Sequence, residues 1–345
     1  MDIVGISATA RYLPKHCILT KDIIEEEGLT PKEVESIATN RVFVAKDEEP
    51  TDMAIKAANT AIERANISPE DIDILVYSSS FNDYLRWSDA ARVQYEIGAE
   101  NCYAFTIEQS CNGSMASIDY AFSRLKTDYD INNVLVVSSG KFEQPLINRW
   151  KAASANYYGD GASAAILSKR NVKFNILGCN SIADGSFNHL WKIPIGGIAE
   201  PATEENVLAG KFKMDCKKTA AEYLSDDIKR EQLYSTLVNN NKKVMLDLLN
   251  RLDYSMEDID KVVLYNVGKH VLDKIIQIIG IDEDRTSTYI SYEHGHMGTP
   301  DILFNLDKML EDGKFEDNDK IMLFSAGAGF TWSSTLLEYR RGDNA

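Results

Sequence analysis

The chain has 345 residues, and its 53 acidic residues outnumber its 37 lysines and arginines, giving a formal net charge of −16. This balance argues against a nucleic-acid-binding protein, which needs a basic face, and against docking on an anionic membrane. With 44% hydrophobic and 26% charged residues, the composition is that of a globular protein with two domains or one large duplicated unit. No apolar run approaches the roughly 20 residues of a membrane span, and the sequence begins without a basic leader, so we expect a cytoplasmic protein.

The cysteines are scattered and form no CxxC pair, so the sequence predicts neither a disulfide framework nor a metal site. The five are Cys17, Cys102, Cys111, Cys179 and Cys216.

Two parts of the chain resemble each other. Segment 66–77 (NISPEDIDILVY) is similar to 254–265 (YSMEDIDKVVLY), with Glu70 aligned to Glu257, and 134–140 (VLVVSSG) is similar to 321–327 (IMLFSAG). Both alignments have the same offset of 187 residues. Each part contains an amphipathic helix, an acidic turn, a short apolar strand, a second helix and another apolar strand. Such strands alternating with helices predict a buried, mostly parallel sheet, and two packed copies predict a layered α/β/α/β/α fold. We place the halves at 1–170 and 171–345.

Cys111, in TIEQSCNGSMASIDYAF, is predicted to lie where a strand gives way to a helix. The positive end of a helix dipole favours the thiolate, and such a thiol suits a nucleophile that accepts an acyl group. The alternative is a small buried residue that opens a helix.

Two glycine-containing motifs follow in the chain. YYGDGASAA begins at Tyr157, and SAGAGFTWSS places a turn at Gly327, Ala328 and Gly329. Taken alone, each predicts a tight turn. Together with the N–H of Cys111, the backbone of the second turn would form an oxyanion hole. Between the motifs, residues 201–242 are polar and helix-prone, which predicts either a cap over a substrate channel or a solvated surface insertion.

The cysteine junction, YYGDGASAA and GAGFTW, in this order, resemble ketoacyl synthase III of the thiolase superfamily, over nearly the whole chain. The resemblance implies the duplicated five-layer thiolase-like α/β fold and a homodimer. It also implies transfer of an acyl group from a coenzyme A or acyl carrier protein (phosphopantetheine) thioester to Cys111, with no cofactor bound permanently.

The sequence departs from this family at two positions. The family's His-Gln-Ala-Asn motif is replaced by LYNVGKHVLDKII, so that Tyr265, Lys269 or His270 takes the place of the histidine. The family's later asparagine is replaced by His296. Both family residues serve the decarboxylation of a malonyl thioester, so a decarboxylating condensation is poorly supported.

His296 followed by Asp301 resembles the Cys-His-Asp branch of the family, whose members transfer acyl groups to hydroxyl or amine acceptors in natural-product pathways. A histidine can remove the acceptor's proton, and a carboxylate can fix its tautomer. Alternatively, Thr299-Pro300-Asp301 is a good helix start with Thr299 as N-cap, in which case Asp301 is structural.

Two other functions stay open at this point. A synthase forming a carbon–carbon bond could use His270 or Asn266, and a non-catalytic subunit could shape an associated synthase. Possible substrate or donor contacts are His189, Asn266 and His270, together with Arg149 and Lys151. Because carrier proteins are acidic, a carrier-bound donor requires a local basic patch on this acidic chain.

Overall fold

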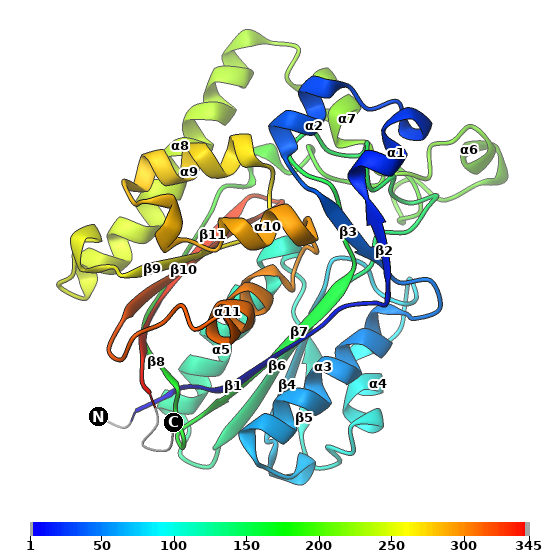
Figure 1. Cartoon of the computed structure of the whole chain (residues 1–345). Coiled ribbons are helices and arrows are strands. Elements are labelled where there is room, and N and C mark those ends of the chain that lie inside the picture. Colours follow the sequence, from blue (N-terminus) through cyan, green and yellow to red (C-terminus); the bar gives the residue numbers. More distant parts are fainter. Residues whose placement is uncertain (1–2, 342–345) are drawn as a thin grey trace.

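The computed structural model describes residues 3–341 and contains a nine-stranded sheet flanked and divided by helices (Figure 1). The strand order is β5-β4-β6-β7-β1-β8-β11-β10-β9. The strands are β1 (Gly5–Tyr12), β4 (Ile74–Ser79), β5 (Tyr103–Thr106), β6 (Asn133–Gly140), β7 (Gly161–Ser168), β8 (Phe174–Ala183), β9 (Lys261–Leu264), β10 (Lys320–Gly327) and β11 (Thr331–Tyr339). A separate hairpin pairs β2 (His16–Leu19) with β3 (Arg41–Val44).

The helices form three of five layers. The central layer, between the two groups of strands, holds α5 (Gly113–Thr127) and α11 (Asp301–Glu311) (Figure 1). One outer layer holds α3 (Pro50–Ala65) and α4 (Asp89–Glu96), and the other holds α8 (Asp227–Arg251) and α9 (Lys269–Ile279). The remaining helices are α1 (Thr20–Glu27), α2 (Pro31–Ile37), α6 (Glu204–Leu208), α7 (Cys216–Tyr223) and α10 (Thr288–His294). The predicted α/β/α/β/α layering is confirmed.

Strand alternation explains why both faces of the sheet are apolar. In β6, Val134 and Val136 join the core around α5 and α11, whereas Leu135 and Val137 join the core beneath α3 and α4. Successive side chains of a strand point to opposite faces, so a strand between two helical layers needs a continuous apolar run. The strand β10 divides its side chains in the same way between the central core and the core under α8 and α9.

The prediction of a mostly parallel sheet is wrong. The pairs β4–β5, β4–β6 and β9–β10 are parallel, whereas β6–β7, β7–β1, β1–β8, β8–β11 and β10–β11 are antiparallel. For β10 and β11 the physical reason is their short connection, which reverses the chain as a hairpin, whereas a parallel pair needs a longer crossover.

The strand pairs related by the 187-residue offset share one pairing register. Ile74 pairs with Val134 in β4 and β6, and Lys261 pairs with Ile321 in β9 and β10. The division of the chain at residue 170 stays a prediction, although it coincides with the connection between β7 and β8.

Residues 201–242 contain α6, α7 and the first part of α8, as their polar, helix-prone character predicts. Most of this segment is exposed, but Cys216 at the start of α7 is buried, and its backbone N–H bonds to the carbonyl of Ala152 at 2.9 Å. Within residues 3–341, no helix has the length and apolar character that crossing a membrane requires.

Candidate active site

Cys111 lies at the predicted strand-to-helix junction. It belongs to a single 3-10 turn, Ser110–Asn112, between the end of β5 and the start of α5. Ser110 has φ +46°, a left-handed conformation that is strained for a residue with a side chain. Gly113 allows α5 to approach β4, since an added Cβ would lie 2.9 Å from the Cβ of Ser78. The thiol is therefore held at the beginning of a closely packed helix.

His296 and Asp301 lie next to this thiol. The Nε2 atom of His296 is 3.1 Å from Cys111 Sγ, and its Nδ1 atom is 2.6 Å from Asp301 Oδ2. Both residues are buried, whereas Cys111 is half-buried. The structure thus brings together the three residues predicted to act as nucleophile, base and orienting carboxylate.

Backbone donors hold the carboxylate of Asp301 at both oxygens. Oδ2 accepts the N–H of Asn266 at 2.8 Å as well as the bond from His296, and Oδ1 accepts the N–H of Met297 at 2.9 Å. These two backbone hydrogen bonds fix the orientation of the carboxylate, with Oδ2 directed at the imidazole of His296.

Two opposing effects determine the protonation of His296. Burial alone would lower the pKa of His296, but the adjacent charges of Asp301 and Cys111 outweigh burial and raise this pKa. The rings of Tyr158 and Tyr265 lie 5.6 and 6.4 Å from the imidazole ring, centroid to centroid. Burial raises the pKa of both tyrosines, so they stay neutral beside the site.

The YYGDG motif supports His296 as well as forming a turn. The N–H of His296 donates to the carbonyl of Tyr157 at 2.8 Å, and the N–H of Gly159 donates to the carbonyl of His296 at 3.0 Å. A Cβ at position 159 would lie 2.5 Å from the carbonyl oxygen of His294, so only glycine fits there.

The alternative in which Thr299 caps α11 is wrong. The helix begins at Asp301, Pro300 takes the N-cap position, and no side chain caps it. The hydroxyl of Thr299 instead donates to the carbonyl of Ser110 at 3.2 Å, and its own carbonyl accepts from Ser114 Oγ at 2.6 Å. Thr299 therefore ties the loop carrying His296 to the cysteine junction, which leaves its hydroxyl unavailable to the helix.

The glycine turn packs against the same junction. An added Cβ at Gly327 would lie 2.9 Å from the backbone nitrogen of Asn112 and 3.1 Å from the carbonyl oxygen of Gln109. The side-chain amide of Asn112 donates to Thr331 Oγ1 at 3.3 Å and to Ser333 Oγ at 2.7 Å, on the strand that follows the turn. Gly327, the first residue of the predicted oxyanion-hole segment 327–329, thus packs directly against the turn that carries Cys111.

Three predicted contact residues have other partners. His189 is exposed, with its ring 6.2 Å from that of Tyr223. His270 hydrogen-bonds through Nδ1 to the carbonyl of Ser36 at 3.0 Å, which joins α9 to α2. The guanidinium of Arg149 donates to the carbonyls of Tyr158 and Phe142 and pairs with buried Asp160. All three were selected by residue type, which does not reveal a structural partner.

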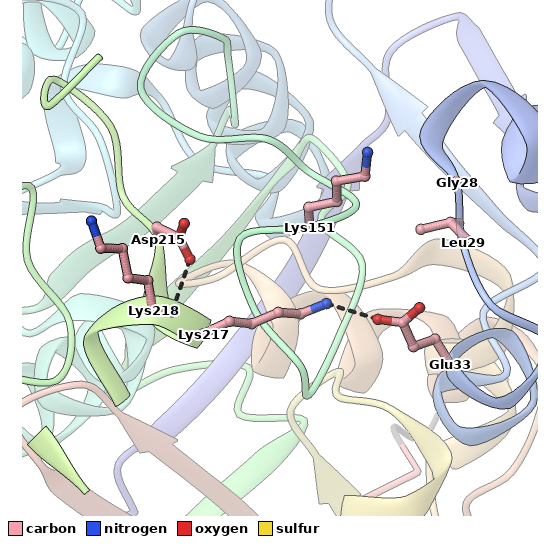
Figure 2. A pocket seen from close by; sticks show the side chains of 7 residues that line it. All are labelled: Gly28, Leu29, Glu33, Lys151, Asp215, Lys217 and Lys218. Atoms are coloured by element: carbon pink, nitrogen blue, oxygen red, sulfur yellow. Dashed lines mark hydrogen bonds and ion pairs between the residues drawn. The ribbon is translucent and has the colours of Figure 1, made fainter. Parts of the chain in front are cut away.

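The other two predicted contacts lie in more suitable places. The backbone of Asn266 holds Asp301, as described above. Lys151 borders a surface pocket of about 500 Å³, together with Gly28, Leu29, Glu33, Asp215, Lys217 and Lys218 (Figure 2). In this pocket Lys217 extends toward Glu33, with Nζ and Oε1 3.0 Å apart. The sequence analysis missed the lysines of α7, although the run Lys213-Met-Asp-Cys-Lys-Lys218 is visible as a basic cluster in an acidic chain.

Comparison with known families accounts for this architecture. The family model described as 3-oxoacyl-[acyl-carrier-protein] synthase III matches residues 105–185, and the model of its C-terminal part matches residues 249–339. The chain belongs to the ketoacyl synthase III-like family. The predicted resemblance is confirmed, and the protein is an enzyme of this family.

Relatives of this synthase III-like enzyme match it along almost its entire length. The β-ketoacyl-[acyl-carrier-protein] synthase III of Campylobacter fetus is 28% identical and covers 98% of this chain and 99% of its own. Among solved structures, ChlB3, described as an acyltransferase, aligns with a TM-score of 0.88 at 22% identity, covering 98% of each chain. The synthase III of Aquifex aeolicus aligns with a TM-score of 0.79 at 23% identity, covering 97% of this chain and 100% of its own. The predicted thiolase-like fold is confirmed.

Proposed function

We propose that this protein transfers an acyl group from a thioester donor, through an acyl-cysteine at Cys111, to a hydroxyl or amine acceptor. The observation that carries the proposal is the continuous chain from Asp301 through His296 to Cys111, with distances of 2.6 and 3.1 Å. A carboxylate bonded to one imidazole nitrogen fixes the tautomer that leaves the other nitrogen available for proton transfer. The described acyltransferase activity of the ChlB3 neighbour supports the same assignment.

The first half-reaction acylates the enzyme. The thiolate of Cys111 attacks the thioester carbonyl, a carbon–sulfur bond forms, and the oxygen becomes an oxyanion that the N–H groups of Cys111 and the Gly327–Gly329 turn receive. The oxyanion then collapses, the carbon–sulfur bond to the donor breaks, and the departing thiolate takes the proton of the His296 imidazolium.

The second half-reaction transfers the acyl group. Neutral His296 accepts the proton of the acceptor's hydroxyl or amine as the acceptor attacks the acyl-cysteine. Collapse of this second tetrahedral intermediate expels Cys111 as a thiolate beside an imidazolium, so the enzyme returns to its starting state. Asp301 keeps its negative charge throughout and stabilises the imidazolium.

The names of the relatives favour a second candidate function, a β-ketoacyl synthase III that forms a carbon–carbon bond. The two candidates differ in their products. A decarboxylating synthase releases carbon dioxide and produces a β-keto thioester, whereas the acyltransferase releases only the donor thiol. Measurement of carbon dioxide and of the product mass separates them.

We propose that the donor enters at the lysine-bordered pocket. Lys151, Lys217 and Lys218 provide positive charge there, which suits the phosphates of coenzyme A or the acidic surface of an acyl carrier protein. Cys216, which precedes Lys217 in the chain, is buried, and burial together with the charges of Asp215 and Cys111 raises the pKa of its thiol to about 12. Because Glu33 and Asp215 also line the pocket, the three lysines leave its lining an excess of one positive charge, on a chain whose net charge is −16.

We also propose a homodimer and a role in natural-product biosynthesis, in keeping with the Cys-His-Asp branch. The strand β5 ends the sheet, and its Tyr103 is 65% exposed and stacks on Phe105 at 5.2 Å. An end strand with an exposed aromatic side chain offers a pairing edge for a second copy. The cytoplasmic location stays a prediction.

The proposed function is tested by intact-mass measurement after incubation with acetyl-CoA, hexanoyl-CoA and the corresponding carrier-protein thioesters. The parent protein should gain one acyl group, and Cys111→Ala should gain none. His296→Ala should form the adduct slowly and release it to nucleophilic acceptors slower still. An adduct that persists in Cys111→Ala, or unimpaired turnover by His296→Ala, refutes the assignment.

A further inference from the structure

An ion pair joins two sides of the pocket that Lys151 borders. Lys217 extends from the first turn of α7 toward α2, where its Nζ atom lies 3.0 Å from Glu33 Oε1 (Figure 2). Both residues line the pocket, and their side chains are 34% and 38% exposed. A ligand that enters the pocket can therefore contact both charges.

The two partners of this ion pair are not held equally. Glu33 belongs to the capping box of α2, in which its Oε2 atom accepts the N–H of Thr30 at 3.0 Å and the hydroxyl of Thr30 at 2.8 Å. The bond from the N–H of Thr30, followed by that from Lys217, lowers the pKa of Glu33 to about 2, so its carboxylate is charged at neutral pH. Among residues 3–341, Glu33 is the only hydrogen-bond partner of Lys217 Nζ, which sits on a flexible four-carbon stem. The carboxylate is thus the fixed partner and the ammonium the movable one.

The other two lysines of the pocket also face carboxylates. The Nζ atom of Lys151 lies 3.4 Å from Glu27 at the end of α1, and that of Lys218 lies 3.9 Å from Glu222. A ligand anion must therefore compete with carboxylates for every ammonium group of this pocket.

A phosphate group competes well with Glu33 for Lys217. Glu33 offers the ammonium one charge and one oxygen, since its other oxygen is bonded to Thr30. A phosphate monoester carries about −1.5 to −2 charges at pH 7 and offers three acceptor oxygens. An ion pair between partly exposed side chains is weak, so its exchange for a stronger anion is favourable. A neutral or singly charged group has no such advantage over the carboxylate.

We propose that Glu33 is a specificity-determining residue, whose carboxylate holds Lys217 across the pocket until a phosphate of coenzyme A displaces it. The proposal rests on the proposed donor entrance and deepens it, because the pocket then selects donors by the charge of their phosphates. No covalent bond changes in this step, since Lys217 exchanges one anion for another. The phosphodiester that joins pantetheine to a carrier protein carries a single charge, the same as Glu33, and gains nothing from the exchange.

The test measures the Kd of coenzyme A by calorimetry and the KM of hexanoyl-CoA in the acylation of Cys111. Glu33→Gln keeps the capping box, which accepts glutamine as well as glutamate, but removes the charge that holds Lys217. We expect both constants to fall about two- to fivefold at unchanged kcat, the size of effect that an ion pair of this exposure gives. Hexanoyl-pantetheine, which has no phosphate, and hexanoyl carrier protein should show the same KM with the variant and the parent.

A second background separates this exchange from a general loss of negative charge. In Lys217→Met no ammonium is left for Glu33 to hold, so the addition of Glu33→Gln should leave the Kd of coenzyme A unchanged. The control is Glu338→Gln, which removes a carboxylate 3.1 Å from Lys320, at the end of the β10–β11 hairpin opposite to Gly327. It should leave the Kd and the KM unchanged.

An unchanged Kd of coenzyme A in Glu33→Gln overturns the proposal. An equal gain in the Lys217→Met background also overturns it, since Glu33 would then repel the ligand directly. A gain of the same size with hexanoyl-pantetheine would show that no phosphate is involved. A parent protein that binds coenzyme A but takes no acyl group at Cys111 refutes the proposed function, whereas the Kd values still decide the role of Glu33.

Discussion

Replacement of Asp301 by asparagine tests the triad with little change in shape. The buried carboxylate accepts three hydrogen bonds, from His296, from the N–H of Asn266 and from the N–H of Met297. An amide offers one oxygen, so its nitrogen must face at least one of these donors. Leaving one buried backbone N–H unpaired costs about 1–3 kcal/mol of stability.

The effect on the reaction should be larger than the effect on stability. Without the carboxylate, the imidazole loses the partner that fixes its tautomer and stabilises its protonated form. We expect the rate of acyl transfer to fall on the order of 10³- to 10⁴-fold, the scale of a carboxylate-to-amide change in a catalytic triad. This corresponds to about 4–5.5 kcal/mol of transition-state stabilisation.

The assay is single-turnover intact-mass spectrometry, with the free energy of unfolding measured on the same preparations. Asp307→Asn is the matched control, because Asp307 is also buried on α11 but bonds to Thr9 Oγ1 at 2.7 Å and pairs with Arg11 and Arg64. It should lose stability and keep its transfer rate. Transfer by Asp301→Asn within tenfold of the parent, or an equal loss in Asp307→Asn, would contradict the role assigned to Asp301.

The other predictions concern the turn, the entrance and the imidazole. Gly327→Ala should slow acylation more than about tenfold by pushing the turn away from Cys111. Gly197→Ala is the control, because Gly197 has open space around it, and it should leave acylation unchanged. Equal acylation rates in the two variants would show that the turn takes no part in the site. Lys217→Glu should raise the KM for coenzyme A thioesters and flatten its dependence on salt with little change in kcat, and an unchanged salt dependence would place the entrance elsewhere. In Cys111→Ala, the pKa of His296 should fall, because the Cys111 charge is one of the effects that raise it; histidine NMR titration measures this, and an unmoved titration would exclude the pairing. A raised pKa stabilises the fold below the unfolded value of about 6.5, and this gain is lost as the pH rises through the folded value, so the free energy of unfolding of the parent relative to His296→Gln should decrease toward alkaline pH.

The sequence was sufficient for the layering and for the three clustered residues. A repeat at one offset requires two similar units, and a cysteine before a helix with a later histidine and aspartate can be recognised in the sequence. The sequence was insufficient to predict the hydrogen bonds that hold these residues in place. The donors to Asp301 include two backbone N–H groups, and any residue other than proline carries one. Nothing in the residue type at position 266 reveals that its backbone faces a carboxylate.

Arg149 shows the limit of residue type in the other direction. An exposed arginine near a donor entrance and a partly buried arginine paired with Asp160 are the same residue type in a sequence, and only packing distinguishes them. The sheet direction failed for a related reason, since apolar strands buried on both faces have the same composition whether their neighbours run parallel or antiparallel.

The hydrogen bond between Cys111 and His296 spans 185 positions of the chain. During translation Cys111 is therefore added to the chain long before His296, because synthesis proceeds at about 5–20 residues per second. During that interval Cys111 is an ordinary thiol with no base beside it. The enzyme acquires its reactivity only when synthesis is nearly finished, so a truncated or half-folded chain does not consume thioesters.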